Sequence, residues 1–510
     1  MSKIVIDPVT RIEGHLKIEV TVDGGEVKEA RSSGTLFRGF EIFLRGRHPL
    51  DAQRITQRVC GVCPTAHATA SSRALDDALG VKDAIPENGR LLRNLIFGCN
   101  YIQSHVLHFY HLAALDFVDV ASAADYAGED LDLAAVRDFI GRGALGPFVP
   151  RDESDFRLPK EENQRLAAHY VQALRVRRLA HEMQAIWSGK MPHSVGIVPG
   201  GVTTPPTMDR IANFLGKLQS VREFIEDRYI PDILAVAKAY PDYFEIGTGC
   251  GKYLSYGGLD AGNGGMHLVG GTTDASLAPA DVDAGRIAES VASSWFQGET
   301  RHPSEGRTEP NVKKEGAHSF IKSPRYGGAT HEVGPLSRTL VAYARGAEPV
   351  KSLVDGTLSA LGAEPKALFS TLGRHAARAL ETKIVADAMV GWLTALAPGE
   401  PHCAESAIPK EGTGYGLTEA PRGALGHWIR IEDGRIAHYQ LVVPTSWNAS
   451  PRDEGGQPGP IEQALTGTKI KDEGNPIEIV RIVRSFDPCL ACAVHAVSPR
   501  GRTLGEYRIA

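Results

Sequence analysis

The chain has 510 residues, of which 42% are hydrophobic, so its composition supports a large core and excludes disorder of the whole chain. Its 56 Lys and Arg residues nearly balance 61 Asp and Glu residues, and the net charge of −5 gives no electrostatic reason to expect binding to nucleic acid or an anionic membrane. No apolar run reaches the ~18 residues needed to cross a bilayer, and the N-terminus lacks the apolar stretch of a secretory signal. We therefore expect any export or membrane attachment to depend on a partner.

Alternation of apolar and polar residues predicts a β-hairpin near each end of the chain. In residues 15–31, Leu16, Ile18 and Val20 alternate with polar residues before a turn that contains two glycines. Residues 427–444 repeat this pattern around a Glu-Asp-Gly turn. Small β elements are therefore expected at both ends.

Between the hairpins, helical periodicity of apolar residues dominates. The predicted helices are 51–80 (apart from a cysteine-containing turn), 87–120, 161–188, 207–240, 281–297 and 363–396. The stretches 145–160, 245–275 and 300–335 are rich in Gly, Pro and charge, which predicts loops. The fold class is therefore predicted as α+β and mainly helical, with a long central helix bundle, in one large domain over residues 1–495.

Four of the seven cysteines form two C-x-x-C pairs, Cys60 with Cys63 and Cys489 with Cys492. Each pair can direct two sulfur atoms to one metal ion, and if both pairs serve one site, the two ends of the chain must meet in the core. The residues alone leave three interpretations open: a structural zinc site, two unrelated redox dithiols, or a thiolate site for a soft, redox-active metal. The other three cysteines are isolated and do not supply the four ligands of an iron–sulfur cluster, so a redox centre here needs a partner to carry electrons.

The sequence resembles a known family, the large, catalytic subunit of [NiFe] hydrogenases. It is most similar to the uptake, membrane-associated kind. The R-x-C-G-x-C-x-x-x-H and D-P-C-x-x-C-x-x-H motifs are highly specific in combination. The matching segments are Asp7–His15, Ser33–Glu41, Arg58–His67, His108–Leu112, Gly189–His193, Pro199–Gly201, Glu419–Gly423, Pro444–Asn448 and Asp487–His495.

The resemblance implies a nickel–iron centre. Cys60, Cys63, Cys489 and Cys492 would bind nickel, and Cys63 and Cys492 would also bridge to an iron that carries carbon monoxide and cyanide. His67 would donate a hydrogen bond to a cysteine sulfur. Because residue 489 is Cys and not selenocysteine, a selenium-containing centre is excluded.

The resemblance also implies how the centre handles protons. Hydrogen is split heterolytically, so a base must take a proton; Cys489 would take it first and Glu13 would pass it on. Arg422 would lie over the metal pair with Asp487 beside it. Many relatives have Asp where this chain has Ser104, and serine cannot supply the charge of that carboxylate.

Further implied features lie outside the nickel–iron centre. Glu41, the backbone carbonyl of Leu441 and His495 would bind Mg²⁺ or a similar divalent ion. A maturation endopeptidase would remove residues 496–510 just after His495.

An iron–sulfur small subunit would take the electrons, in a heterodimer or a higher oligomer, and pass them to a b-type cytochrome or a quinone-linked acceptor. Co-export with that subunit predicts a location on the periplasmic, outer face of the membrane, with the cytoplasm as the alternative. The expected function is the reversible oxidation of hydrogen to two protons and two electrons. A hydrogen-sensing subunit and a non-catalytic relative with a structural metal are the alternatives.

Overall fold

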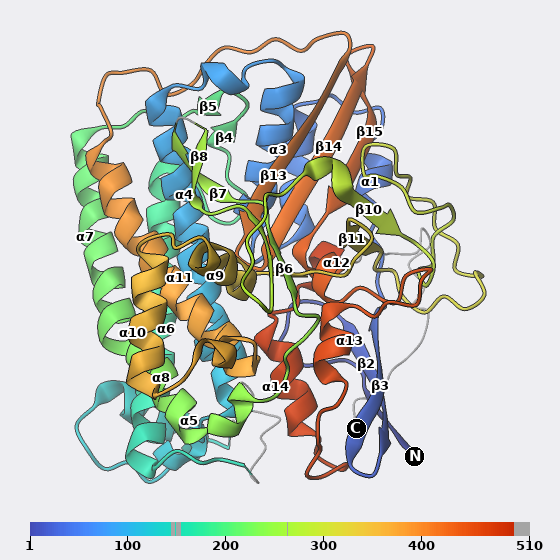
Figure 1. Ribbon diagram of the computed structural model, residues 1–510. Coiled ribbons are helices and arrows are strands. Elements are labelled where there is room, and N and C mark those ends of the chain that lie inside the picture. Colours follow the sequence, from blue (N-terminus) through green and yellow to red (C-terminus); the bar gives the residue numbers. More distant parts are fainter. Residues whose placement is uncertain (144–147, 149–154, 263, 494–510) are drawn as a thin grey trace.

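The computed structural model describes residues 1–143, 148, 155–262 and 264–493, except for the side chains of the last two (Figure 1). Its helices are α1 (Phe40–Phe43), α2 (Asp51–Thr56), α3 (Pro64–Ala78), α4 (Glu87–Leu107), α5 (Leu131–Gly141), α6 (Lys160–Ser188), α7 (Met208–Phe224), α8 (Ile230–Ala239), α9 (Pro335–Ala344), α10 (Val350–Leu361), α11 (Thr371–Thr394), α12 (Pro444–Asn448), α13 (Pro460–Leu465), α14 (Ile477–Ser485) and α15 (Leu490–Ala493). Its strands are β1 (Ser2–Ile6), β2 (Leu16–Asp23), β3 (Glu26–Gly34), β4 (Ile197–Val198), β5 (Gly201–Val202), β6 (Lys252–Ser255), β7 (Gly258–Gly262), β8 (Gly265–Leu268), β9 (Gly271–Asp274), β10 (Ile287–Ser290), β11 (Ser323–Tyr326), β12 (Glu332–Val333), β13 (Gly412–Ala420), β14 (Gly423–Glu432) and β15 (Arg435–Val442).

A bundle of long helices forms one side of the molecule (Figure 1). Helix α4 packs against α6 and α11, and α7 packs against the same two helices. Helices α4 and α11 have buried residues all around their circumference, as expected for helices in the middle of a core. Helix α6 ends where the sequence predicts, at Gly189, whose φ of 80° suits glycine. These elements confirm the predicted central bundle.

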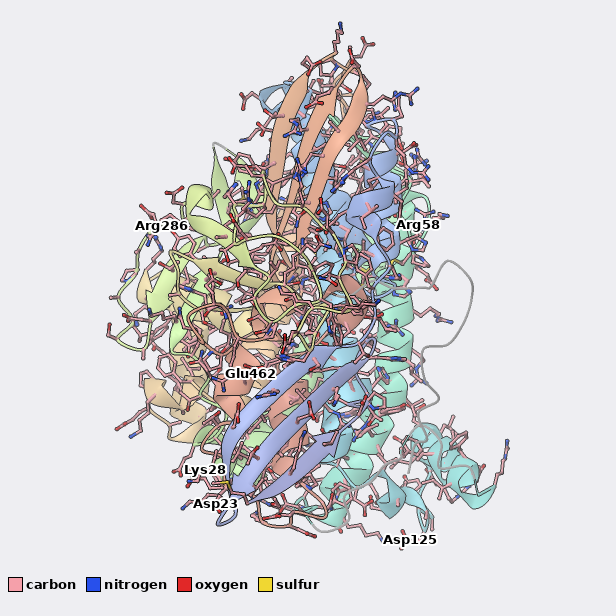
Figure 2. All side chains as sticks on the ribbon, turned by 90° about the vertical axis from the view of Figure 1, so that its right-hand side faces the viewer. Asp23, Lys28, Arg58, Asp125, Arg286 and Glu462 are labelled. Atoms are coloured by element: carbon pink, nitrogen blue, oxygen red, sulfur yellow. The ribbon has the colours of Figure 1, made fainter. Side chains whose placement is uncertain are left out.

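Two three-stranded antiparallel sheets lie toward opposite ends of the molecule, as Figure 2 shows. In the N-terminal sheet, Leu16, Ile18, Val20 and Val22 of β2 face the core, which confirms the predicted hairpin. The C-terminal sheet confirms the second hairpin, β14 with β15, and adds β13 at its edge. Strand β13 lies against α3 at Gly414 and Gly416, where a Cβ atom would meet backbone carbonyl oxygens of α3 at 2.3 and 2.1 Å. Glycine at these positions therefore lets α3 approach the sheet closely.

Three local predictions are wrong. Residues 281–297 do not form a helix but contain β10, which pairs with β11. Residues 245–275 are not only loops, because they contain β6 to β9, and residues 300–335 contain β11 and β12. These strands have two to five residues each, so they leave little periodicity to detect. Strands β7 and β8 pair with each other as neighbours, whereas β10 pairs with β11 and β12 with β6 across long stretches of the chain. Part of the remaining predicted loop, 145–160, lies outside the described residues.

The two ends of the chain meet through backbone contacts. Leu490 N donates to the carbonyl oxygen of Glu13 at 2.7 Å, and Glu13 N donates to the carbonyl oxygen of Pro488 at 3.3 Å. Gly14 has a φ of 81°, and a Cβ atom there would lie 2.7 Å from the Cβ of Leu490. A glycine is therefore required where the N-terminal segment crosses the second cysteine pair.

Candidate metal centre

Three cysteine sulfur atoms converge in the core. Cys60, Cys63 and Cys489 are buried and their Sγ atoms lie within 4.8 Å of one another, with 3.3 Å between those of Cys60 and Cys489. Cys492 lies in α15, but its side chain is outside the described part of the structure. The structure thus brings one member of the second pair to both members of the first.

Local backbone geometry explains why the first pair converges. Cys60 is extended and follows a 3-10 turn, whereas Cys63 directly precedes α3, which begins with Pro64. The backbone N–H groups of Val62 and Cys63 donate to Sγ of Cys60 at 3.3 and 3.1 Å. Such donors stabilise a thiolate, the form of cysteine that binds a metal. The buried, sulfur-only donor set fits a soft transition metal.

Arg422 supplies positive charge next to the sulfur atoms. Its guanidinium is buried and forms an ion pair of 3.0 Å with Asp487. Burial lowers the pKa of Arg422, but Asp487 and the thiolates of Cys489, Cys63 and Cys60 outweigh it and hold this pKa well above its usual range. A permanent cation in this position offsets part of the cost of burying thiolates.

The orientation of Arg422 is fixed by two neighbours. Its Nε donates to the backbone carbonyl oxygen of Asp487 at 3.1 Å, and one terminal nitrogen donates to Oγ of Ser104 in α4 at 3.3 Å. Asp487 itself has a φ of 54°, which is uncommon for a residue other than glycine. Ser104 thus contacts the guanidinium through a neutral hydroxyl.

Glu13 contacts the second cysteine pair directly. Its Oε2 accepts hydrogen bonds from Sγ of Cys489 at 3.1 Å and from the backbone N of Ala491 at 2.8 Å. Burial and then the negative charge of Cys60 raise the pKa of Glu13, although its hydrogen bonds and Arg422 oppose this. A carboxyl group with a raised pKa beside a sulfur atom can accept a proton and release it again.

His67 lies on α3 and contacts the C-terminal sheet. Its Nδ1 is 3.2 Å from Nε2 of His427, whose Nδ1 is 2.8 Å from the hydroxyl of Tyr439. Burial lowers the pKa of His67 to about 4, although the charge of Cys60 opposes this, so the ring is neutral. The donation from His67 to a cysteine sulfur stays a prediction. His427 and Tyr439 were missed because neither belongs to a recognised motif.

The second predicted metal site is partly described. Oε1 of Glu41 accepts from the backbone N of Leu441 at 2.9 Å, so two of the predicted ligands are neighbours. His495 lies outside the described residues. Lys322 and Glu289, which the sequence did not suggest, lie beside them: Nζ of Lys322 is 3.4 Å from Glu41 and 3.8 Å from Glu289. Burial raises the pKa of Glu289, and the charge of Lys322 opposes it.

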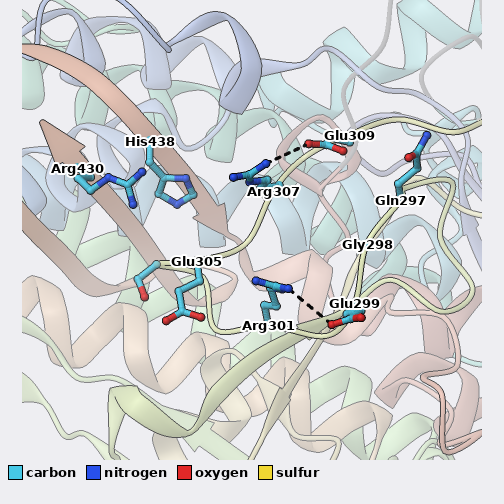
Figure 3. A pocket seen from close by; sticks show the side chains of 10 residues that line it. Gln297, Gly298, Glu299, Arg301, Glu305, Arg307, Glu309, Arg430 and His438 are labelled. Carbon is cyan, nitrogen blue, oxygen red and sulfur yellow. Dashed lines mark ion pairs between the residues drawn. The ribbon is translucent and has the colours of Figure 1, made fainter. Parts of the chain in front are cut away.

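A surface pocket of about 580 Å³ contains none of the predicted site residues. Figure 3 shows its mixed charges, with ion pairs of 3.6 Å between Arg301 and Glu299 and of 3.9 Å between Arg307 and Glu309. Because these charges neutralise one another in pairs, the pocket offers no preference for a charged ligand. The buried cysteine cluster therefore remains the candidate site.

Comparison with known proteins identifies the family. The model of the nickel-dependent hydrogenases matches residues 38–495, and a HoxL-like model matches residues 3–33. The chain belongs to the nickel-dependent hydrogenase family. The large subunit of the periplasmic [NiFeSe] hydrogenase of Desulfomicrobium baculatum is 43% identical over 97% of this chain and 95% of its own. The uptake hydrogenase large subunit of Rhizobium leguminosarum bv. viciae is 38% identical over 100% and 97%.

A solved structure agrees with this assignment. The Ni-Fe-Se hydrogenase of D. vulgaris Hildenborough in its reduced state has a TM-score of 0.87 and 43% identity, covering 97% of this chain and 100% of its own. The α+β fold is thus that of a hydrogenase large subunit.

This hydrogenase chain is the catalytic large subunit of an uptake-type [NiFe] enzyme that oxidises hydrogen at a nickel–iron centre, and such large subunits pair with a small subunit. Residue 489 is cysteine here, although relatives named as [NiFeSe] enzymes are among the most similar. Among the described residues, no helix is both long and apolar enough to cross a membrane.

Proposed function

We propose that Cys60, Cys63, Cys489 and Cys492 bind nickel, and that Cys63 and Cys492 also bridge to an iron carrying carbon monoxide and cyanide. The convergence of three buried sulfur atoms from opposite ends of the chain, within 4.8 Å of one another, carries this proposal. Soft thiolate ligands suit a redox-active metal that cleaves hydrogen into protons and electrons.

The protein residues in this proposal manage protons and charge. Cys489 takes the first proton, and Glu13, whose Oε2 lies 3.1 Å from that sulfur, accepts it next. Arg422 holds a fixed positive charge over the site, and Asp487 fixes its orientation through the 3.0 Å ion pair. Oxidation of one hydrogen molecule releases two protons along this route and two electrons to the partner.

The same proposal assigns the second metal site to Mg²⁺ or a similar divalent ion. Glu41, the carbonyl oxygen of Leu441 and His495 are its protein ligands. Support comes from the burial of Glu41 and its contact with the backbone of Leu441. Hard oxygen ligands suit such a cation.

The proposed partners follow from the need to remove electrons. An iron–sulfur small subunit accepts them and passes them to a b-type cytochrome or a quinone-linked protein. An endopeptidase removes residues 496–510 after His495, and co-export with the small subunit places the complex on the outer face of the membrane. A large-subunit relative from Wolinella succinogenes is named quinone-reactive, which supports a quinone-linked acceptor.

Infrared spectroscopy of the complex purified from its native host tests the centre. Protein absorbs little where metal-bound carbon monoxide and cyanide stretch, so we expect isolated bands there that shift under hydrogen. Metal analysis should find nickel and iron, and mass spectrometry should find a large subunit that ends at His495. A fully processed complex that contains zinc instead of nickel and lacks these bands would refute the proposal.

A further inference from the structure

Four buried polar side chains form a continuous run between α3, one helical turn after Cys63, and the C-terminal sheet. Nδ1 of His67 is 3.2 Å from Nε2 of His427, Nδ1 of His427 is 2.8 Å from the hydroxyl oxygen of Tyr439, and that oxygen is 2.9 Å from Oγ of Ser71. All four residues are at most 1% exposed. No step of the proposed reaction uses the last three.

The fold places these residues together for identifiable reasons. His67 and Ser71 are four positions apart on α3 and share a face. Tyr439 of β15 pairs with Ile429 of β14, so it lies diagonally across from His427 on the same face of the sheet. Gly416 of β13 lies opposite His427, and the absence of a side chain there lets α3 come within hydrogen-bond distance of that ring.

The His427 imidazole is neutral. Burial lowers its pKa well below its usual range, and its Nε2 and Nδ1 lie within hydrogen-bond distance of His67 and Tyr439. Burial also raises the pKa of Tyr439, which therefore keeps its proton. A neutral imidazole has one N–H donor and one acceptor nitrogen, so the hydrogen bonds along the run must all point in one direction, either toward the cysteines or away from them.

The hydrogen bond that is predicted between His67 and a cysteine sulfur decides between the two directions. Because Nδ1 of His67 faces His427, only Nε2 is left for the predicted hydrogen bond to a cysteine. A metal-bound thiolate can accept a hydrogen bond but has no proton to donate. An N–H on Nε2 is therefore favoured over a lone pair, which the thiolate would repel.

We propose that Ser71, Tyr439, His427 and His67 form one directed hydrogen-bond relay in which Tyr439 holds His67 in the tautomer that donates to a cysteine of the metal centre. In the structure the Tyr439 hydroxyl donates to Oγ of Ser71 at 2.9 Å. A hydroxyl hydrogen rotates about its C–O bond, and in the relay it turns to Nδ1 of His427, so that Ser71 donates to Tyr439 instead. Nε2 of His427 then donates to Nδ1 of His67. Tyr439 is thus a positioning residue that acts through two histidines. This inference rests on the proposed function, since it needs a metal-bound thiolate.

The relay has an electronic consequence. A hydrogen bond donated to a thiolate withdraws electron density from the sulfur and therefore from the metals it binds. Without the Tyr439 hydroxyl, Nδ1 of His427 loses its donor, and His427 can adopt the other tautomer and leave Nε2 of His67 without a proton. The metals then become richer in electrons, which lowers the stretching frequency of carbon monoxide bound to iron.

The test compares Tyr439→Phe with Tyr240→Phe in the complete, matured complex. Tyr240 is also a fully buried tyrosine, and its hydroxyl donates to the carbonyl oxygen of Phe117 at 2.8 Å, outside the relay. We expect Tyr439→Phe to shift the carbon monoxide and cyanide bands to lower wavenumber, or to split them, while Tyr240→Phe leaves them at their wild-type positions. Unchanged bands in Tyr439→Phe would overturn the relay.

Ser71→Ala tests the direction of the hydrogen bonds. In the proposed direction Ser71 only donates to Tyr439, which can donate to His427 without it, so the bands should stay in place. In the opposite direction Ser71 accepts the Tyr439 proton, and its loss would free that proton for His427 and shift the bands. A shift in Ser71→Ala would therefore refute the proposed direction.

A second pair of variants covers the case in which Tyr439→Phe does not assemble. His427→Gln keeps an amide N–H that can donate to His67, whereas His427→Leu has a similar size and no donor. We expect wild-type bands with Gln and shifted bands with Leu; identical spectra would overturn the relay. A wild-type complex without any such bands would instead refute the proposed metal centre.

Discussion

Replacement of Glu13 by Gln should block proton transfer and leave the metal centre intact. The glutamine carbonyl can still accept from the backbone N of Ala491, which contacts Oε2 of Glu13 at 2.8 Å in the wild type. The amide is nearly the same size, and the backbone bonds that join residue 13 to the second cysteine pair do not change. The variant therefore loses only the ability to accept and release a proton.

The position of Glu13 next to Cys489 determines how much activity Glu13→Gln should lose. A positioned proton acceptor contributes about 10²- to 10⁴-fold to a rate, which corresponds to about 3 to 5 kcal/mol of activation free energy. Glu13 contacts the sulfur of Cys489 directly at 3.1 Å, and its raised pKa brings its proton affinity closer to neutral pH. We therefore expect Glu13→Gln to lose activity toward the upper end of this range.

Two assays separate proton transfer from hydrogen binding. Hydrogen oxidation with an artificial electron acceptor measures complete turnover, and HD formation from hydrogen in D₂O measures cleavage with exchange of the released proton. Both rates should fall together in Glu13→Gln, while nickel content and the infrared bands stay at wild-type values. Glu19→Gln is the control, because this carboxylate lies in β2 and pairs with Lys3 and Lys17 at a distance from the cysteines.

The outcome of these assays is decisive for Glu13. If Glu13→Gln retains more than about a tenth of wild-type turnover with full metal content, another group must accept the proton. If turnover and nickel content fall in parallel, Glu13 holds the centre together instead of moving protons.

Three further perturbations have defined outcomes. Arg422→Lys keeps the charge but cannot make all of the arginine's contacts to Asp487 and Ser104. Because the loss of one charged hydrogen bond costs about 1.5–3 kcal/mol, the steady-state rate of hydrogen oxidation should fall about 10- to 100-fold. Cys489→Ser replaces a soft ligand by a hard one, so metal analysis should show loss of nickel. Burial raises the pKa of Glu462 from 4.5 to about 7. Between these pH values the folded chain keeps this proton and the unfolded chain releases it. The free energy of unfolding therefore falls by about 3 kcal/mol as the pH rises through this window. The melting temperature of Glu462→Gln, measured by calorimetry, should exceed that of the wild type at pH 8 and approach it near pH 4.5.

The sequence predicted features that depend on local patterns or on complete motifs. The alternation from Leu16 to Val22 marks a strand with one buried face, and Gly189 marks the end of a long helix; both lie where they were predicted. The convergence of Cys489 with Cys60 and Cys63 was predictable because the two motifs resemble those of a family in which they serve one metal centre. Spacing alone left zinc and redox dithiols as alternatives.

Features that depend on non-local contacts were missed. Strand β10 lies in a segment of helix-like composition and is a strand because β11, more than 30 positions later, pairs with it. The contact between His427 and His67 requires a close approach of α3 to the sheet at Gly416, and nothing in the sequence around His427 indicates it. Tertiary packing therefore determines what local propensity cannot.

Ser104 changes the balance of charge around Arg422. With a neutral hydroxyl at this position, Asp487 is the carboxylate paired with Arg422 among the described residues, and a second buried cation, Arg378, lies near the same carboxylate. Two guanidinium groups therefore share one aspartate, and the thiolates of the cysteine cluster supply the remaining negative charge, as their effect on the pKa of Arg422 indicates. A carboxylate at position 104 would compete with the sulfur atoms for this guanidinium. The serine thus leaves the positive charge of Arg422 directed toward the metal centre, where it can stabilise thiolates and the electron density they carry.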